Sequence, residues 1–142
     1  MNINSLTIKA QEALQSAVTL ARDAGQQAVE PQHLLMALLK EDDSLSNFLL
    51  GRVGVNVRML KSELQQAIDA LPKVSGGNGE QYFSSDTSKV IQHAVDFTRT
   101  FNDKYASVEH LLLGLVAERG AASDMLKRAG ASEKELIVAI RE

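Results

Sequence analysis

The stretch Glu30-Pro-Gln-His-Leu-Leu35 ends in the triplet His33-Leu34-Leu35, and the chain uses the same triplet again at His110-Leu111-Leu112. A shift of 77 residues superimposes the two triplets. The same shift pairs Ala17-Val18 with Ala94-Val95, Arg22 with Arg99, Leu38 with Leu115 and Glu41 with Glu118. After a one-residue deletion, a shift of 76 pairs Leu50 with Leu126, Arg52 with Arg128, Gly54 with Gly130 and Leu60 with Leu136. Self-similarity over this length indicates an internal tandem duplication.

Helical periodicity dominates both halves. Apolar residues recur every three or four positions from Ala10 to Ala21 and again from Val90 to Phe101. We therefore predict an all-α fold of two tandem, pseudo-two-fold-related repeats of about four helices each, packed as one globular domain. The first repeat is expected at about 6–71, the linker at about 72–83 and the second repeat at about 84–142.

Capping residues mark the expected helix ends, since Ser, Thr and Asn favour helix starts, Pro the first position, and Gly the left-handed end. The expected boundaries, in chain order, are Thr7 and Gly25 for the first helix, Pro31 for the second, Ser46 to Val53 closed by Gly54 for the third, and Asn56 for the fourth. Those of the second repeat are Ser85 or Asp86, then Ser107, then Ser123 to Ala129 closed by Gly130, and finally Ser132, in a capping box with Glu135.

The connection between the repeats reads Leu71-Pro-Lys-Val-Ser-Gly-Gly-Asn-Gly79. Proline stops the preceding helix, and the glycine cluster predicts a flexible connection. A phosphate-cradling loop is excluded here, because no Gly-Lys-Ser/Thr follows and no strand precedes the glycines.

Composition excludes several classes of function. The 142 residues contain no cysteine, and 15 basic against 18 acidic residues give a net charge of -3 without a basic cluster. We therefore expect no nucleic-acid partner. The longest apolar runs fall short of the roughly 20 residues of a membrane span, and the N-terminus carries no secretory signal. We expect no membrane partner and a cytoplasmic location.

The histidines do not form a metal or catalytic constellation. His33 and His110 each follow a helix start, with no second histidine three or four positions away, so a helix-start histidine bonding its neighbouring backbone is the expected role. His93 with Asp96 or Asp103 and a serine lacks the frame of a hydrolytic triad, and His93 with Asp96 is interpreted as an exposed polar pair. We predict no enzyme activity, no metal and no cofactor in this chain.

A surface site is the remaining alternative. On the helix expected near 87–101, Phe97 lies at the edge of the apolar arc and His93 just beyond it. The centre of that arc is predicted at Val90, Ala94, Thr98 and Phe101. An apolar edge beside a second helix start is suited to a shallow groove for an extended peptide.

Four segments, in this order and spacing, closely resemble the N-terminal domain of Clp/heat-shock AAA+ unfoldases. They are Lys9-Ala-Gln-Glu-Ala-Leu14, Glu30-Pro-Gln-His-Leu-Leu35, Leu71-Pro-Lys-Val-Ser-Gly76 and Ser107-Val-Glu-His-Leu-Leu-Leu113. The linker makes the chain look most like the ClpB-type disaggregases rather than ClpA or ClpC. The resemblance covers essentially the whole chain, which is then expected to be an excised domain of a longer ATPase.

The resemblance implies a domain, monomeric when isolated, that is mobile on a linker, engages unfolded or aggregated polypeptide, and helps deliver it to the AAA+ modules of the parent hexamer. ATP and Mg would belong to those downstream modules. The implied client-binding positions are Thr7, His93, Phe97, Asp103, Glu109 and His110. Adaptor proteins are further implied partners, so a ClpC- or ClpA-like adaptor-docking domain is the alternative function.

Two of these positions depart from the family pattern. His93 and His110 replace apolar side chains that are common there, which suggests a more polar, pH-sensitive rim. In ClpC-type relatives an acidic residue that precedes the histidine of each repeat receives phosphorylated arginine. Because Gln32 takes that place in the first repeat and only Glu109 is acidic, a two-site version is not expected.

Overall fold

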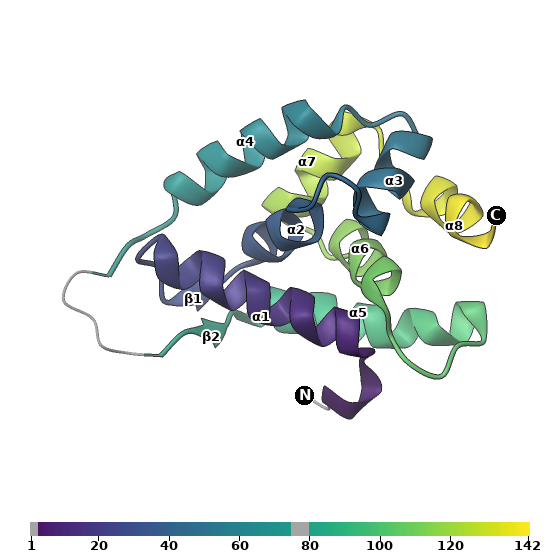
Figure 1. The fold of residues 1–142 in the computed structure, drawn as a ribbon, viewed down its shortest axis with the longest axis horizontal. Helices are drawn as coiled ribbons and strands as arrows, with labels where there is room; N and C mark the ends of the chain where they lie inside the picture. Colours follow the sequence, from purple (N-terminus) through teal and green to yellow (C-terminus); the bar gives the residue numbers. More distant parts are fainter. Residues whose placement is uncertain (1–2, 75–79) are drawn as a thin grey trace.

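A computed structural model describes residues 3–74 and 80–142, and its architecture is mainly helical (Figure 1). The described residues form a 3-10 turn at Ile3–Ser5, two short strands and eight α-helices. The first repeat holds α1 (Ile8–Asp23), β1 (Ala28–Val29), α2 (Pro31–Leu39), α3 (Leu45–Arg52) and α4 (Val57–Asp69). The remainder holds β2 (Tyr82–Phe83), α5 (Ser85–Phe101), α6 (Val108–Ala117), α7 (Ala121–Ala129) and α8 (Glu133–Arg141). The predicted fold of two four-helix repeats is confirmed.

Most helices begin at or next to the predicted caps, but α3 begins at Leu45 after the cap Ser44, and α7 begins at Ala121, two residues before the predicted Ser123. Thr7 Oγ1 accepts from the N–H of Ala10 at 3.1 Å, and Asn56 Oδ1 accepts from Met59 at the start of α4. For α5 the cap is Ser84, one residue before the predicted start. Ser132 Oγ accepts from the N–H of Glu135, and its hydroxyl contacts the Glu135 carboxylate at 3.1 Å.

The second helix of each repeat lies at the centre of the molecule. Every residue of α6 from 110 to 116 is buried, and α6 contacts α1, α2, α3, α5, α7 and α8. Leu34 and Leu35 of α2 and Leu111 and Leu112 of α6 are fully buried. Burying each of these side chains contributes about 1.5–3 kcal/mol, so the duplicated Leu-Leu pairs form the middle of the core.

Two backbone pairings cross between the repeats, and the sequence predicted neither. In β1 and β2, Val29 pairs in parallel with Phe83, and Leu6 pairs in parallel with Ala106 as an isolated bridge. The 77-residue shift carries Leu6 onto Phe83 and Val29 onto Ala106, so the two pairings are symmetry mates. Each joins the residue that precedes the first helix of one repeat to the residue that precedes the second helix of the other.

The connection between the repeats differs from the prediction at its end. Residues 82–83, which were expected to be linker, form β2, and the N–H of Val74 donates to Gly25 O at 2.9 Å. Ladder hydrogen bonds to the first repeat therefore hold the end of this segment. The predicted flexible glycine cluster at 75–79 lies outside the described residues, and the repeat boundaries stay predictions.

The two helices α5 and α6 approach each other closely at Gly114. A Cβ atom at this position would lie 2.5 Å from the carbonyl oxygen of Val90 and 3.3 Å from the backbone nitrogen of Ala94. Atoms that belong to backbone cannot move aside as a flexible side chain does. Ala37 is the equivalent residue of α2 in the first repeat, so the α5–α6 contact is the one that requires glycine.

We predict that Gly114→Ala lowers the free energy of unfolding by about 1–3 kcal/mol, because the added methyl group forces the two helices apart. Urea unfolding followed by circular dichroism measures this change. Gly51→Ala is the matched control: Gly51 lies in α3 with open space around its Cβ position, and alanine there is expected to stabilise by about 0.5–1 kcal/mol. Equal stability of the Gly114→Ala variant and the unsubstituted chain would contradict the proposed close approach.

Candidate functional site

The two matched histidines occupy the same position of their helices and make the same hydrogen bond. His33 Nδ1 accepts from the N–H of Glu30 at 2.9 Å, and His110 Nδ1 accepts from the N–H of Ser107 at 2.8 Å. Each histidine is the third residue of its helix and satisfies a backbone donor at the helix start, as Glu or Gln does in a capping box. Because Nδ1 accepts, the ring proton of each neutral imidazole is on Nε2.

His33 is part of an internal network. Its Nε2 lies 2.6 Å from Gln26 Oε1, and Gln26 Nε2 donates to Ile68 O at 2.6 Å and to Leu71 O at 3.4 Å. Both His33 and Gln26 are buried, and burial lowers the pKa of His33 below its usual 6.5. The bond to the Glu30 backbone agrees with the structural role predicted from the sequence, and the link through Gln26 to the end of α4 was not predicted.

His110 makes a different contact with its second nitrogen. Nε2 lies 3.1 Å from Asp103 Oδ2, but the carboxylate is out of line for a hydrogen bond, so the contact is an electrostatic one. The ring of Phe101 meets the imidazole edge-on at a centroid distance of 5.4 Å, and Arg141 of α8 lies over Phe101 at 5.3 Å. The side chain of His110 is only 1% exposed, whereas that of Asp103 is 48% exposed. The expectation of a surface rim at His110 is therefore corrected: the imidazole lies beneath Asp103.

Asp103 closes the end of α5 as well as facing His110. Its N–H donates to Thr98 O at 2.8 Å, and the preceding Asn102 adopts the left-handed conformation with φ 56°. This is the geometry in which a helix end satisfies its last carbonyl groups. The turn fixes the Asp103 backbone, while its carboxylate remains half-exposed.

His93 pairs with a residue that the sequence analysis did not single out. Its Nε2 lies 3.0 Å from Glu118 Oε1, whereas Asp96 accepts from Gln92 Nε2 at 3.0 Å, so the predicted His93–Asp96 pair is wrong. Phe101 near the end of α5 contacts His110 near the start of α6, so the two helices run antiparallel. His93, two turns before Phe101, therefore faces Glu118, two turns after His110. This helix register predicts Glu118 as the partner of His93, but the register cannot be assigned before the contact between Phe101 and His110 is known.

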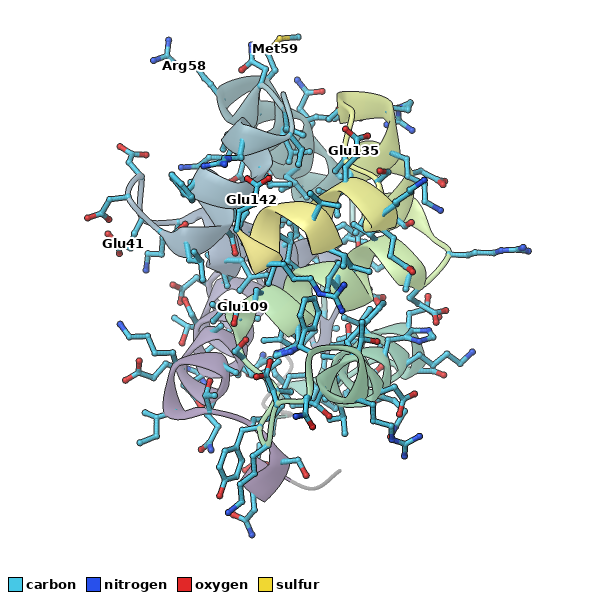
Figure 2. All side chains as sticks on the ribbon, turned by 90° about the vertical axis from the view of Figure 1, so that its right-hand side faces the viewer. Glu41, Arg58, Met59, Glu109, Glu135 and Glu142 are labelled. Atoms are coloured by element: carbon cyan, nitrogen blue, oxygen red, sulfur yellow. The ribbon has the colours of Figure 1, made fainter. Side chains whose placement is uncertain are left out.

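The other predicted positions lie around the start of α6. The backbone N–H of Thr7 donates to Ala106 O at 2.9 Å, which places the start of α1 beside the loop that leads into α6. Glu109 is half-buried in the first turn of α6, where a carboxylate is favoured by the helix dipole. Figure 2 shows Glu109 on the side of the molecule that also presents α8 and Glu142.

Five of the six predicted positions thus form three groups. Asp103 and His110 are in contact, Thr7 and Glu109 flank the loop before α6, and His93 lies at the far end of the α5–α6 pair. Phe97 is half-buried and packs against the core. Arg141 and Glu118 are the neighbours that sequence reasoning missed, because neither is close to its partner along the chain.

No three His, Asp or Glu side chains in the described part of the chain are grouped so that they could hold a metal ion. None of the described helices has the length and apolar character needed to cross a membrane.

The family model for the Clp repeat (R) N-terminal domain matches residues 5–129. The chain belongs to the Clp N-terminal domain family. It is 48% identical to the chaperone protein ClpB of Porphyromonas gingivalis and 42% identical to that of Bacteroides thetaiotaomicron, in both cases over the whole of this chain. The chain spans 16% of the length of these relatives.

Several solved structures share this fold. The Hsp104 N-terminal domain from Candida albicans superimposes with a TM-score of 0.83 at 20% identity, covering 97% of this chain and 90% of that one. The N-terminal domain of ClpD from Arabidopsis thaliana gives 0.70 at 27% identity, covering 98% and 94%. A further structure, described as a peptide from the EAEC T6SS Sci1 SciI protein, gives 0.80 at 17% identity, covering 98% and 88%.

The lowered pKa of His33 predicts a pH-dependent stability. The unfolded chain binds a proton at this residue near pH 6.5, while the folded chain resists it, so stability rises with pH in this window. The contribution of His33 is complete above 6.5 and is lost as the pH falls below that value. We expect His33→Gln, which keeps a side-chain acceptor for the Glu30 N–H, to flatten the fall in melting temperature between pH 7.5 and pH 5.

The control for this prediction is Gln92→Ala, an exposed substitution on α5 that leaves all three histidines in place. Thermal unfolding at a series of pH values compares the slopes rather than the absolute stabilities. The same slope for His33→Gln and for the control would show that burial of His33 does not set the acid sensitivity.

Proposed function

We propose that this chain is a substrate-binding accessory domain of an ATP-dependent protein disaggregase. In this proposal it engages unfolded or aggregated polypeptide and helps deliver it to a hexameric AAA+ ring. The observation that carries the proposal is the 48% identity to the N-terminal region of a ClpB chaperone, in a match that covers all 142 residues of this chain. The peptide named in the description of one solved structure with this fold supports polypeptide as the ligand class.

The chemistry required of such a domain is reversible binding. A client chain offers backbone N–H groups, apolar side chains and basic side chains. The proposed site offers the half-exposed carboxylate of Asp103, the carboxylate of Glu109 and the apolar edge of Phe97. His110 acts from below in this proposal, because its contact with Asp103 positions the carboxylate.

The binding is expected to be weak. The acidic groups are near the surface, where an ion pair contributes about 0.2–1 kcal/mol. A flexible client also loses conformational freedom when it is held against a shallow surface. Weak binding agrees with a delivery role, because a client must leave the domain to enter the ring.

We predict that Asp103→Asn and Glu109→Gln each weaken binding of an unfolded, non-aggregating polypeptide about two- to fivefold, which corresponds to the loss of one exposed charge contact. Titration followed by amide resonances measures the affinity, and shifts are expected near Phe97, Asp103 and Glu109. Asp96→Asn is the matched control, since Asp96 is an exposed carboxylate on α5 outside the proposed site.

Three outcomes separate the alternatives. Failure of the polypeptide to bind anywhere on the domain would refute the proposed function. Binding that is equally strong in all three variants would refute the site while leaving the function. Binding of a folded adaptor protein, but of no unfolded chain, would favour the adaptor-docking alternative.

A further inference from the structure

The first repeat contains a hollow of about 690 Å³ that the proposed function does not use. Its lining comes from α1, from the end of α2 with the connection to α3, and from Val108 at the start of α6. The side chains and backbone that line it belong to Lys9, Glu12, Ala13, Ser16, Ala37, Leu38, Lys40, Glu41, Asp43, Ser44, Leu45, Ser46 and Val108.

The equivalent space in the second repeat is bridged. Under the 77-residue shift, Ser16 corresponds to His93 and Glu41 to Glu118. In the second repeat, His93 Nε2 lies 3.0 Å from Glu118 Oε1, and this contact links α5 to the end of α6. Ser16 is too short to reach across in the same way. The two helices α1 and α2 also carry Ala37 where Gly114 allows the close approach of α5 and α6. The boundary between the first and second helices, here called the seam, is therefore open at the surface in the first repeat and closed in the second.

Exposed apolar side chains flank the open seam. Ile8 at the start of α1 is 74% exposed and lies one turn before Glu12 on the same side of the helix. Leu45 lines the hollow from α3, and Phe48, one turn further along α3, is 60% exposed. Large apolar side chains exposed together at a hollow indicate a contact surface more strongly than the same side chains would singly.

The charges of the hollow favour a cationic ligand. Glu12, Glu41 and Asp43 line it, and among the described residues none of these carboxylates pairs with a cation. Lys9 and Lys40 also line it, so the lining carries three negative against two positive charges. Figure 2 shows Glu41 projecting outward at the α2–α3 connection.

The hollow adjoins the site proposed above. Val108, which lines it, is the neighbour of Glu109, and Lys9, which also lines it, lies two residues after Thr7. Thr7 and Glu109 therefore lie close along the chain to residues that line the hollow.

We propose that this hollow is a second polypeptide contact of the domain, and that it takes an extended segment with an apolar side chain against Leu45 and a basic side chain beside Glu41 and Asp43. The inference rests on the proposed polypeptide-binding function, but it concerns a different surface. Apolar side chains supply the surface area that is buried on binding. Glu41 and Asp43, in the connection between α2 and α3, favour basic over acidic clients.

The test uses the 142-residue chain and two soluble unfolded peptides of alternating composition, one of leucine and lysine and one of leucine and glutamate. Amide resonances of residues 12–16, 37–45 and 108 are expected to shift with the lysine peptide, whose affinity should exceed that of the glutamate peptide at least fivefold. Leu45→Ser combined with Phe48→Ser is expected to weaken the lysine peptide at least fivefold. Met59→Ser combined with Val138→Ser, which removes two exposed apolar side chains elsewhere, is the matched control.

Two further variants examine the physical basis. Glu41→Gln with Asp43→Asn should reduce the preference for lysine over glutamate to less than twofold. Ser16→His, which copies the side chain at the equivalent position of the second repeat, should weaken binding by filling the hollow. Circular dichroism shows whether each variant remains folded, and all of these positions except Ser16 are exposed, so loss of the fold is not expected.

The outcomes separate this inference from the proposed function. Shifts confined to the surroundings of Phe97 and Asp103 would overturn the second contact and leave the function intact. Absence of binding by either peptide and by the unfolded polypeptide would remove both. A dimer in sedimentation velocity that Leu45→Ser with Phe48→Ser dissolves would show that the surface binds a second copy of the chain, and would also overturn the inference.

Discussion

The two symmetric backbone pairings between the repeats are the constraint on which the rest of this structure depends. Leu6 with Ala106 and Val29 with Phe83 each tie the start of a first helix to the start of a second helix in the other repeat. These hydrogen bonds position Thr7 and Ser84, which cap α1 and α5, and they bring the loop before α6 to the side of α1. A repeat folded by itself would leave both of its strand segments without partners, which favours packing of the two halves as one core.

The two histidines share one structural role through Nδ1 but make different contacts through Nε2. His33 and His110 accept the same backbone hydrogen bond at the third position of their helices. Beyond that bond, His33 meets the buried amide of Gln26, whereas His110 meets the half-exposed Asp103. The same residue therefore stabilises the interior in one repeat and faces a surface carboxylate in the other.

The contact between the first and second helices also differs between the two repeats. Gly114 lets α5 and α6 approach so closely that a methyl group would meet the backbone of Val90, and His93 with Glu118 closes the end of that seam. In the first repeat Ala37 and Ser16 line a hollow at the equivalent place. One alanine in place of glycine and one serine in place of histidine thus accompany an open surface, although both repeats have four helices in the same order.

The sequence by itself determined the helices and most of their caps, because these depend on hydrogen bonds and apolar contacts between residues three or four positions apart. It also revealed the duplication, as self-similarity at a shift of 77 residues. It also predicted that the paired histidines are structural. Only the tertiary structure decided that Phe83 and Leu6 form strand pairs, that His93 meets Glu118 and not Asp96, and that His110 is buried beneath Asp103. Each of these depends on how two helices or two repeats lie against each other, and short backbone pairings of two residues carry too little periodicity to be recognised in one sequence.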